Sequence, residues 1–170
     1  MPGRDDFEEF VAARSAALLR TAYLLTGHHQ DAEDLVQTAL VKAVPAWRRI
    51  TGDPEPYVRR ILVRENISRW RQRRWREVYV DHVPERPATD PDPSGRLELA
   101  AALGQLAPRQ RAVVVLRFYE DLTERETAEL LGVSIGTVKS QARDALARLR
   151  TVLPEESRVT VPDEVGPAGQ

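Results

Sequence analysis

Apolar residues recur along most of the chain at intervals of three and four, which is the spacing of one face of an α-helix. The pattern predicts helices over about residues 5–25, 31–44, 57–79, 96–106, 108–119, 123–131 and 135–152. Gly27 is suited to end the first helix, and Pro45 should disrupt or restart the second. Signals for strands are nearly absent, so we predict an all-α fold.

Residues 81–95 separate the predicted helices into two groups. This segment contains four prolines and four acidic residues, a composition that cannot build a core and favours an extended linker. We therefore expect two small helical domains, residues 1–80 and 97–153, joined by an acidic, proline-rich linker over 81–96. The tail, residues 154–170, has three prolines and little aliphatic bulk, and we expect it to be disordered.

The net charge of −1 conceals a strongly basic segment. Residues 57–76 contain eight arginines and a single acidic residue, Glu65. Eight like charges on one helix repel one another unless an anionic partner neutralises them, so the segment predicts binding to nucleic acid. A membrane surface is a poorer partner because the segment lacks the aliphatic stripe of an interfacial helix. The rings of Tyr57, Trp70 and Trp75 either stack on unpaired bases or anchor the helix in the core.

Residues 122–150 have the pattern of a helix-turn-helix motif. Thr123 and Glu126 form a predicted capping box at the start of the first helix, and Gly132 is suited to end it in the left-handed conformation. Ser134 is the predicted cap of the second helix. Ala128 provides a small side chain where the two helices can cross closely.

The second helix of this motif has an apolar back and a polar front. Val138 is predicted to face inward, on the same stripe as Leu146 and Leu149. The outward face presents short hydroxyls and cations, namely Thr137, Lys139, Ser140 and Arg143. Such a face suits a recognition helix in the major groove of DNA. An ordinary helical hairpin with a solvated, charged face would give a similar pattern.

The composition argues against several other classes of protein. The chain has no cysteine, which excludes a disulfide scaffold, a thiolate zinc site and a cysteine nucleophile. Its three histidines have no metal-binding spacing, and no catalytic motif lies beside the basic segment, so we expect no metal, no cofactor and no enzymatic activity. No apolar stretch is long enough for membrane insertion, and the first residues lack the apolar core of a signal peptide, so we expect a cytoplasmic protein.

Two segments resemble parts of the sigma-70 family of RNA polymerase sigma factors. Residues 31–43, DAEDLVQTALVKA, resemble the polymerase-binding part of region 2, and residues 106–140, from LAPRQRAVVV to SIGTVKS, resemble region 4. With regions 2 and 4 in this order, the chain resembles an extracytoplasmic-function (ECF, group 4) sigma factor. The run YVRRILV at 57–63, followed by SRWR at 68–71, is similar to the actinobacterial branch.

The resemblance implies two contacts with core RNA polymerase. The helix over 31–43 would bind the clamp helices of the largest subunit, and the residues assigned to this contact are Asp31, Asp34, Leu35, Gln37 and Lys42. The apolar segment 106–118 would meet the flap tip of the second-largest subunit. The acidic linker would thread toward the active-site cleft. An anti-sigma factor that competes with polymerase is a further possible partner.

The resemblance also implies that both domains bind promoter DNA. The −10 element would be read and opened by the loop 50–56 and the helix after it, and the loop would capture an extruded base. The residues assigned to this contact are Asp53, Tyr57, Arg60, Arg64, Arg69, Trp70, Arg71, Arg73 and Arg74. The helix over 135–150 would read the −35 element, to which we assign Arg125, Ser134, Thr137, Lys139, Ser140 and Arg143. Arg64 stands where many similar family members carry asparagine, which leaves the recognised −10 base open.

The alternative is a stand-alone helix-turn-helix regulator with an N-terminal sensor or dimerisation domain. It accounts equally well for residues 122–150. It predicts a dimer that binds a palindromic site without polymerase. It leaves the helix rich in arginine and tryptophan unexplained.

Overall fold

The computed structural model describes residues 4–77 and 96–155, and the structural statements below concern these residues. The chain divides between residues 88 and 89 into two compact units. Unit 1 contains the described residues 4–77 and unit 2 the described residues 96–155. Both are helical, and no strand occurs in the described residues, in agreement with the all-α prediction. The predicted linker and tail lie almost wholly outside the described residues.

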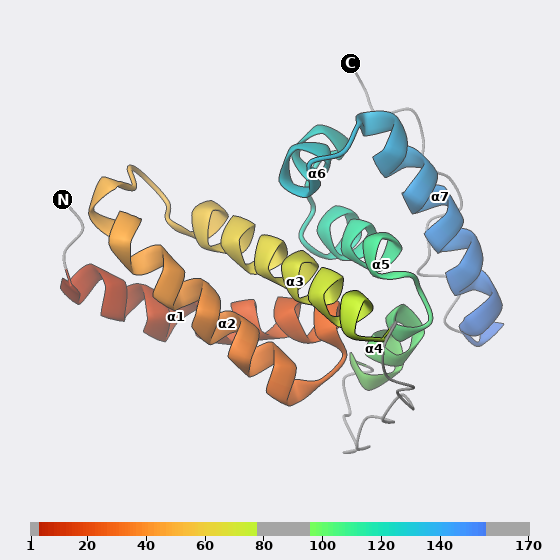
Figure 1. The fold of residues 1–170 in the computed structure, drawn as a ribbon, viewed down its shortest axis with the longest axis horizontal. Coiled ribbons are helices and arrows are strands. Elements are labelled where there is room, and N and C mark those ends of the chain that lie inside the picture. The colour runs from red at the N-terminus through yellow and green to blue at the C-terminus, as the bar shows by residue number, and fades with distance from the viewer. Residues whose placement is uncertain (1–3, 78–95, 156–170) are drawn as a thin grey trace. The chain divides into compact units, whose positions relative to one another are not determined.

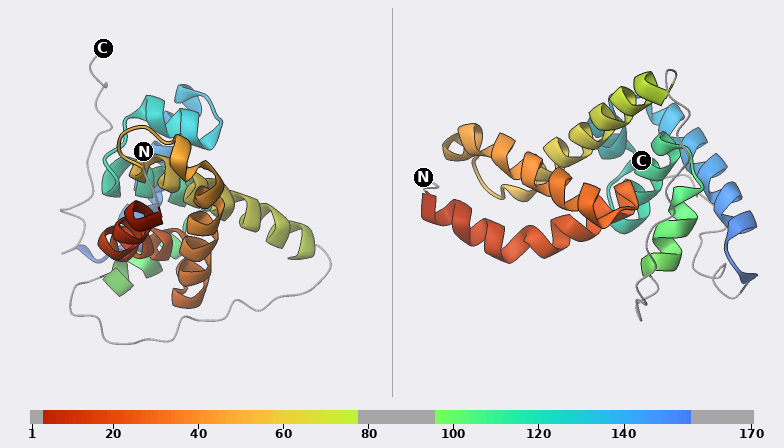
Figure 2. Two further views of the ribbon diagram at one scale, coloured as in Figure 1. Left: turned by 90° about the vertical axis from the view of Figure 1, so that its left-hand side faces the viewer. Right: turned by 60° about the horizontal axis from the view of Figure 1, so that its bottom comes forward.

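Unit 1 is built from three long helices that pack against one another (Figures 1 and 2). They are α1 (Arg4–Thr26), α2 (His29–Ala43) and α3 (Glu55–Glu77), and the 3-10 helix η1 (Val44–Arg49) continues α2. Gly27 follows α1 with a φ of 76°, and Pro45 lies in the first turn of η1, where the helix tightens. Both residues therefore act as the sequence predicted. The core is formed by apolar side chains that recur at helical spacing along the three helices, including Leu18, Ala22, Leu25, Leu35, Val36, Ala39, Val58 and Leu62.

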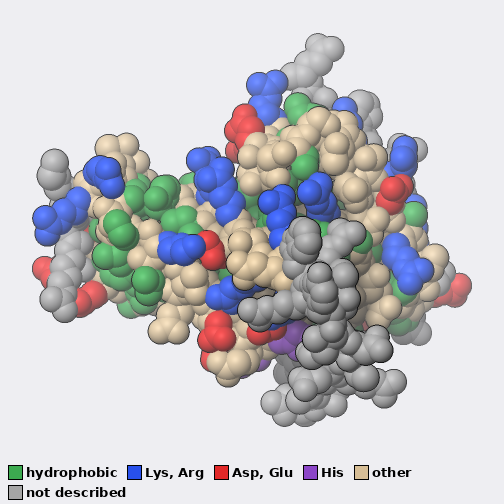
Figure 3. Space-filling view, in the orientation of Figure 1, with side chains coloured by type: hydrophobic (Ala, Val, Ile, Leu, Met, Phe, Trp, Pro, Cys, Tyr) green, Lys and Arg blue, Asp and Glu red, His purple; other side chains and the backbone are tan. Residues whose placement is uncertain are grey.

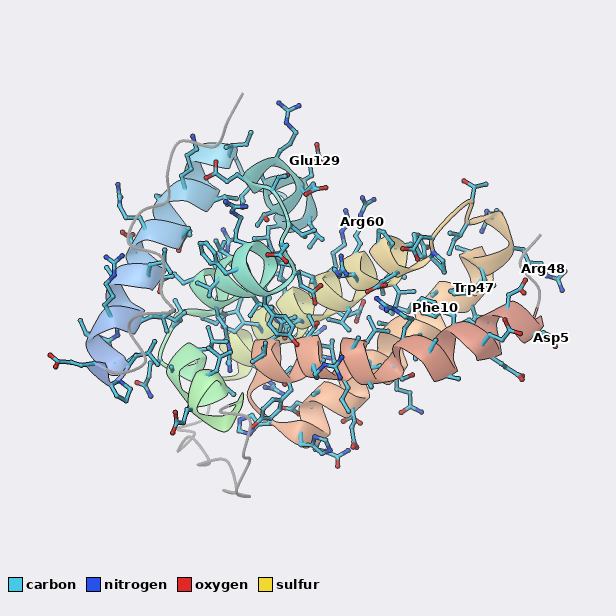
Figure 4. The ribbon with its side chains drawn as sticks, turned by 180° about the vertical axis from the view of Figure 1, so that it is seen from behind. Asp5, Phe10, Trp47, Arg48, Arg60 and Glu129 are labelled. Carbon is cyan, nitrogen blue, oxygen red and sulfur yellow. The ribbon has the colours of Figure 1, made fainter. Side chains whose placement is uncertain are left out.

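An aromatic cluster fixes η1 on α1. Trp47 of η1 is only 4% exposed. Its ring centroid lies 4.9 Å from that of Phe7 in an edge-to-face arrangement and 5.1 Å from that of Phe10 (Figure 4). Such pairs add to the free energy gained from burying the rings. The loop 50–54 after η1 therefore starts from a fixed position beside α1.

Unit 2 contains four α-helices and one π-helical turn in its described residues. They are α4 (Arg96–Gly104), α5 (Pro108–Val114), the π-helical turn η2 (Val115–Tyr119), α6 (Glu124–Leu131) and α7 (Ile135–Val152). α5 and η2 together occupy the predicted helix 108–119. Ala128 of α6 packs with Val113 of α5 and with Val138 and Ala142 of α7, so it lies at the helix crossing as predicted. No helix in the described residues is long and apolar enough to cross a membrane.

Candidate nucleic-acid and partner interfaces

The helix-turn-helix of unit 2 is capped by the residues that the sequence indicated. The Thr123 hydroxyl accepts a hydrogen bond from the Glu126 amide across 3.1 Å, and the Glu126 carboxylate accepts one from the Thr123 amide across 2.7 Å. Gly132 ends α6 with a φ of 67°. The Ser134 hydroxyl accepts from the Thr137 amide across 3.1 Å and starts α7. The ends of α6 and α7 and the turn between them are thus formed by residues close together in the sequence.

The outward face of α7 divides into capping hydroxyls and solvent-exposed cations. Ser134 and Thr137 share a hydrogen bond of 2.9 Å between their hydroxyls, and the Ser140 hydroxyl donates to the Thr137 carbonyl across 3.1 Å. Lys139 and Arg143 are exposed, with 55% and 75% of their side-chain surface open to solvent. Val138, Leu146 and Leu149 are buried behind them, as predicted, and Arg125 is exposed on α6. Of the α7 residues assigned to the −35 element, Thr137 and Ser140 are half-buried, so the two cations are the ones best placed to reach an anionic ligand.

A buried carboxylate that the sequence analysis missed lies behind this face. Glu124, the first residue of α6, is 5% exposed. Its carboxylate lies 3.9 Å from the Arg117 guanidinium of η2 and 3.7 Å from the Lys139 ammonium of α7. In the sequence Glu124 resembles an ordinary acidic residue in the first turn of a helix, so no local signal distinguishes it.

The basic helix α3 has two distinct faces. On the face toward α2, Glu65 forms an ion pair with Lys42, Arg69 donates to the Thr38 hydroxyl across 2.8 Å, and Arg73 donates to Asp31 across 2.9 Å. These α3 residues are four apart and therefore share one side of the helix. Because the α2 numbers fall as the α3 numbers rise, the two helices are antiparallel.

The other face of α3 is open to solvent. Arg60, Arg64 and Arg71 are exposed, and the picture of side chains shows Arg60 projecting from α3 (Figure 4). Lys and Arg side chains also gather over α3 in the space-filling view (Figure 3). Tyr57 and Trp70 are half-buried, so part of each residue is accessible to solvent. The side chain of Arg74 lies outside those that the structure describes.

One of the residues assigned to the polymerase contact is buried. Leu35 is 0% exposed in the core of unit 1, so its assignment as a contact residue is wrong. Asp34 and Gln37 are exposed on α2. Asp31 and Lys42 are accessible but are already paired with Arg73 and Glu65 of α3. Of the five assigned residues, four therefore reach the surface.

The apolar segment 106–118 is likewise mostly internal. Its buried side chains form part of the core of unit 2, namely Leu106, Ala112, Val113, Val114, Val115 and Leu116. The expectation that this apolar stretch meets a partner directly is therefore wrong for these side chains, because they already fill the unit. Arg109 and the adjoining Tyr119, which is 43% exposed, are accessible.

An exposed apolar patch, formed by Val41, Val44 and Pro45, lies where α2 passes into η1. Val41 is 64% exposed and Val44 is 52% exposed. The space-filling view shows hydrophobic side chains gathered over this end of α2 (Figure 3). Neither valine continues the buried stripe of α2, formed by Leu35, Val36, Ala39 and Ala43, and this spacing is the signal in the sequence that they face solvent.

The loop between η1 and α3 borders a cavity of about 430 Å³. The cavity is lined on one side by α1, including Ala13 and Arg14, and on the other by Gly52, Asp53 and Pro54 of the loop. The Asp53 carboxylate accepts a hydrogen bond of 3.0 Å from the Glu55 amide and so caps α3. α3 thus begins two residues earlier than predicted.

The start of α3 is also tied to α1. The Glu55 carboxylate binds Arg14 of α1 and, across 3.0 Å, Arg59 of α3. Its side chain is only 14% exposed, so these contacts are better shielded from water than surface ion pairs. Together with the Asp53 cap, they hold the α3 end of the loop beside the cavity, while the packing of Trp47 on α1 holds the η1 end.

Comparison with known proteins identifies the family. Sigma-70 region 2 matches residues 10–76, and sigma-70 region 4 matches residues 96–149. The RNA polymerase sigma-E factor of Streptomyces coelicolor is 43% identical over 152 residues, which cover 87% of this chain and 86% of the relative. The chain belongs to the sigma-70 family. Its relatives place this sigma factor in the ECF group, since the ECF RNA polymerase sigma factor SigL of Mycobacterium tuberculosis is 35% identical over 153 residues, which cover 83% of this chain and 85% of the relative.

Solved structures agree with this family. The sigma factor RpoE of Bartonella quintana, crystallised with the anti-sigma factor NepR, matches with a TM-score of 0.72 and 29% identity, over 86% of this sigma factor and 96% of that chain. The ECF sigma factor SigJ of Mycobacterium tuberculosis matches with a TM-score of 0.60 and 27% identity, over 84% of this chain and 52% of that one. The match to region 2 accounts for the arginine-rich helix that a stand-alone regulator left unexplained.

Proposed function

We propose that the sigma factor binds core RNA polymerase and directs promoter-specific initiation, with unit 1 acting on the −10 element and unit 2 on the −35 element. The observation that carries the proposal is the pairing of two DNA-binding surfaces in one chain: the open arginine face of α3 and the capped recognition helix α7. Each surface alone would bind DNA weakly, whereas two modules held by one polymerase select both elements together.

At the −35 element, α7 enters the major groove. Lys139 and Arg143 extend from α7 and supply the cations that contact DNA. Thr137 and Ser140 bring short hydroxyls close to the bases. Ser134 acts mainly through the cap that fixes the N-terminal end of α7, the end that usually contacts base edges. Arg125 on α6 is placed to contact the DNA backbone, which positions a helix without reading sequence.

At the −10 element, the open face of α3 holds the separated strand. Arg60, Arg64 and Arg71 neutralise phosphates, and the accessible parts of Tyr57 and Trp70 stack on unpaired bases. The cavity beside the loop 50–54 receives an extruded base, and Asp53 lies at its edge. Arg69 and Arg73 add to the basic surface once they leave their α2 partners, and we assign Arg74 to the same DNA contact.

At the polymerase, α2 is the docking helix. Asp34 and Gln37 offer exposed polar groups, Asp31 and Lys42 flank them, and Val41 and Val44 offer apolar surface next to them. We assign these groups to the clamp helices of the largest subunit. In unit 2, the accessible Arg109 and Tyr119 are the groups that segment 106–119 can offer to the flap tip.

The remaining assignments concern location and regulation. We propose that the protein acts in the cytoplasm, where its polymerase and promoters are found. An anti-sigma factor is a candidate inhibitor, and support comes from the similar Bartonella quintana sigma factor, whose structure contains one. The linker 81–96 is proposed to enter the polymerase cleft, where its carboxylates resemble the charge of nucleic acid.

Run-off transcription tests the proposal. Purified core polymerase is incubated with a pool of genomic promoter fragments, with and without the sigma factor. We expect discrete new start sites that appear only with the sigma factor, and their alignment gives both promoter elements. Specific duplex binding by the protein alone, without any transcription, would contradict the proposal and favour the dimeric regulator.

A further inference from the structure

The buried carboxylate of Glu124 joins three helices of unit 2. One of its oxygens lies 3.9 Å from Nη2 of Arg117 on η2, and the other lies 3.7 Å from Nζ of Lys139 on α7. Arg117 is itself anchored, because its Nη1 donates to the Leu122 carbonyl just before α6. The recognition helix is therefore linked through one carboxylate to the two elements packed behind it.

Stability alone does not account for this carboxylate. Removing a carboxylate from water costs free energy that nearby cations only partly return, and an apolar residue of similar volume often serves packing as well or better. Oε1 of Glu124 has no hydrogen-bond partner in the structure, so the pair is not an optimised one. Favourable interaction with the dipole of α6 would be available to an exposed glutamate as well. The burial of Glu124 therefore calls for another role.

The effect of Glu124 falls on Lys139, the exposed member of the group. A lysine on a flexible stem samples many rotamers and contacts any phosphate within reach. Attraction to Glu124 confines the Lys139 ammonium to the α6 side of α7 and partly neutralises its charge. Confinement lowers the entropic cost of one defined contact, whereas neutralisation weakens indiscriminate contacts with phosphates. Both effects raise the ratio of specific to non-specific DNA binding.

We propose that Glu124, held by Arg117, is a positioning residue that sets the specificity of Lys139 for the −35 element. The inference rests on the proposed role of α7 in reading that element. Arg117 provides a second cation that stays with the carboxylate when Lys139 turns toward DNA, so Glu124 is not left as an unpaired buried charge.

The test compares Glu124→Gln with Glu129→Gln, the same chemical change on an exposed residue of the same helix (Figure 4). Each full-length variant is assembled with core polymerase, and its affinities for promoter fragments with intact and scrambled −35 elements are measured at several salt concentrations. Glu124→Gln should lower the ratio of the two affinities on the order of tenfold. It should also steepen the salt dependence on the scrambled fragment by about one phosphate contact. Glu129→Gln should change neither, and an unchanged ratio in Glu124→Gln overturns the proposal.

Lys139→Gln separates this inference from the proposed function. If Glu124 acts through Lys139, Glu124→Gln causes no further loss of discrimination in a Lys139→Gln background. An equal loss in both backgrounds indicates a purely structural role and overturns the proposal. If Lys139→Gln alone leaves the ratio unchanged, the proposed DNA contact of Lys139 is wrong and the inference fails with it.

A second substitution guards against a folding defect. Glu124→Met keeps an unbranched side chain of similar size and removes the charge, so unit 2 should remain folded. Thermal unfolding of each variant checks this directly. Glu124→Met should show the same loss of discrimination as Glu124→Gln, and full discrimination in a folded Glu124→Met protein overturns the proposal.

Discussion

Arg73 on α3 donates a hydrogen bond to Asp31 on α2 across 2.9 Å. The first residue is a proposed contact of the −10 strand and the second a proposed contact of the polymerase, so the two functions of unit 1 meet in one ion pair. One turn away, Arg69 donates to the Thr38 hydroxyl and, across 3.3 Å, to the Asp34 carbonyl. On the proposed assignments, Arg69 and Arg73 would have to leave their α2 partners before they could bind DNA. We therefore expect DNA binding and polymerase binding by unit 1 to influence each other.

Arg73→Gln should weaken promoter opening while leaving the fold intact. The Arg73 and Asp31 side chains are 55% and 29% exposed, and ion pairs this accessible contribute about 0–1 kcal/mol to the free energy of unfolding. The charge lost from the strand-holding surface should reduce permanganate reactivity of −10 thymines in the open complex. Arg20→Gln, which removes an exposed arginine from α1, is the control and should have no effect. Loss of more than about 2 kcal/mol of stability in Arg73→Gln would show that the pair is structural instead.

Leu35 and Gln37 should respond to substitution in opposite ways, although they are two residues apart on α2. Leu35→Ala leaves a cavity in the core and should lower the free energy of unfolding by about 2–5 kcal/mol. Gln37→Ala removes an exposed group, so it should change stability by less than about 0.5 kcal/mol and weaken polymerase binding. Chemical unfolding and fluorescence anisotropy with core polymerase measure the two effects. Full polymerase affinity in Gln37→Ala would remove Gln37 from the interface.

The parts of the fold that follow from local sequence were predictable. The caps at Thr123 and Ser134 and the left-handed Gly132 need only residues three to five positions apart, and the structure has them as expected. Gly27 and Pro45 mark helix boundaries for the same reason, since each acts through its own backbone. These helix ends and the helix-turn-helix were therefore accessible before any tertiary information.

What depends on distant segments was not predictable. Arg69 and Arg64 look alike in sequence. Arg69 is hydrogen-bonded and Arg64 is exposed because α2, more than 30 residues away along the chain, packs beside Arg69 only. Glu124 reads as a surface charge until η2 and α7 cover it. Leu35 could have been assigned correctly, because it belongs to the apolar stripe of α2 that forms the core.

Filling the cavity beside the loop 50–54 should impair recognition of the −10 element selectively. Ala13 is exposed on α1 and lines the cavity, so Ala13→Trp places an indole where the extruded base would lie. The measurement is transcription from a set of promoters in which each −10 position carries each of the four bases in turn. In Ala13→Trp, the amount of transcript should no longer depend on which base occupies one of these positions. Binding to the −35 element should persist because unit 2 is untouched. Ala12→Trp, on the neighbouring exposed position, is the control, and equal effects of both substitutions would rule out the cavity as the base site.

Gly132→Ala should destabilise unit 2 through backbone conformation alone. Gly132 has a φ of 67°, and a Cβ placed there would meet nothing within 4 Å, so the only cost is the left-handed conformation, about 1–2 kcal/mol. For a domain of this size, each kcal/mol lowers the melting temperature by about 4–8 °C. The strain falls on the turn between α6 and α7, so −35 binding should fail at a lower temperature than in the unchanged protein.

Gly104→Ala is the matched control for this prediction. Gly104 ends α4 without a positive φ, and a Cβ there would also meet nothing within 4 Å. Alanine restricts the unfolded chain more than glycine does, so this substitution should leave stability unchanged or raise it by up to about 1 kcal/mol. Calorimetry on the two variants measures the difference. If Gly132→Ala melts at the same temperature as Gly104→Ala, the left-handed turn does not hold α6 and α7 together, and the angle between them must instead be set by the packing of Ala128 against Val138 and Ala142.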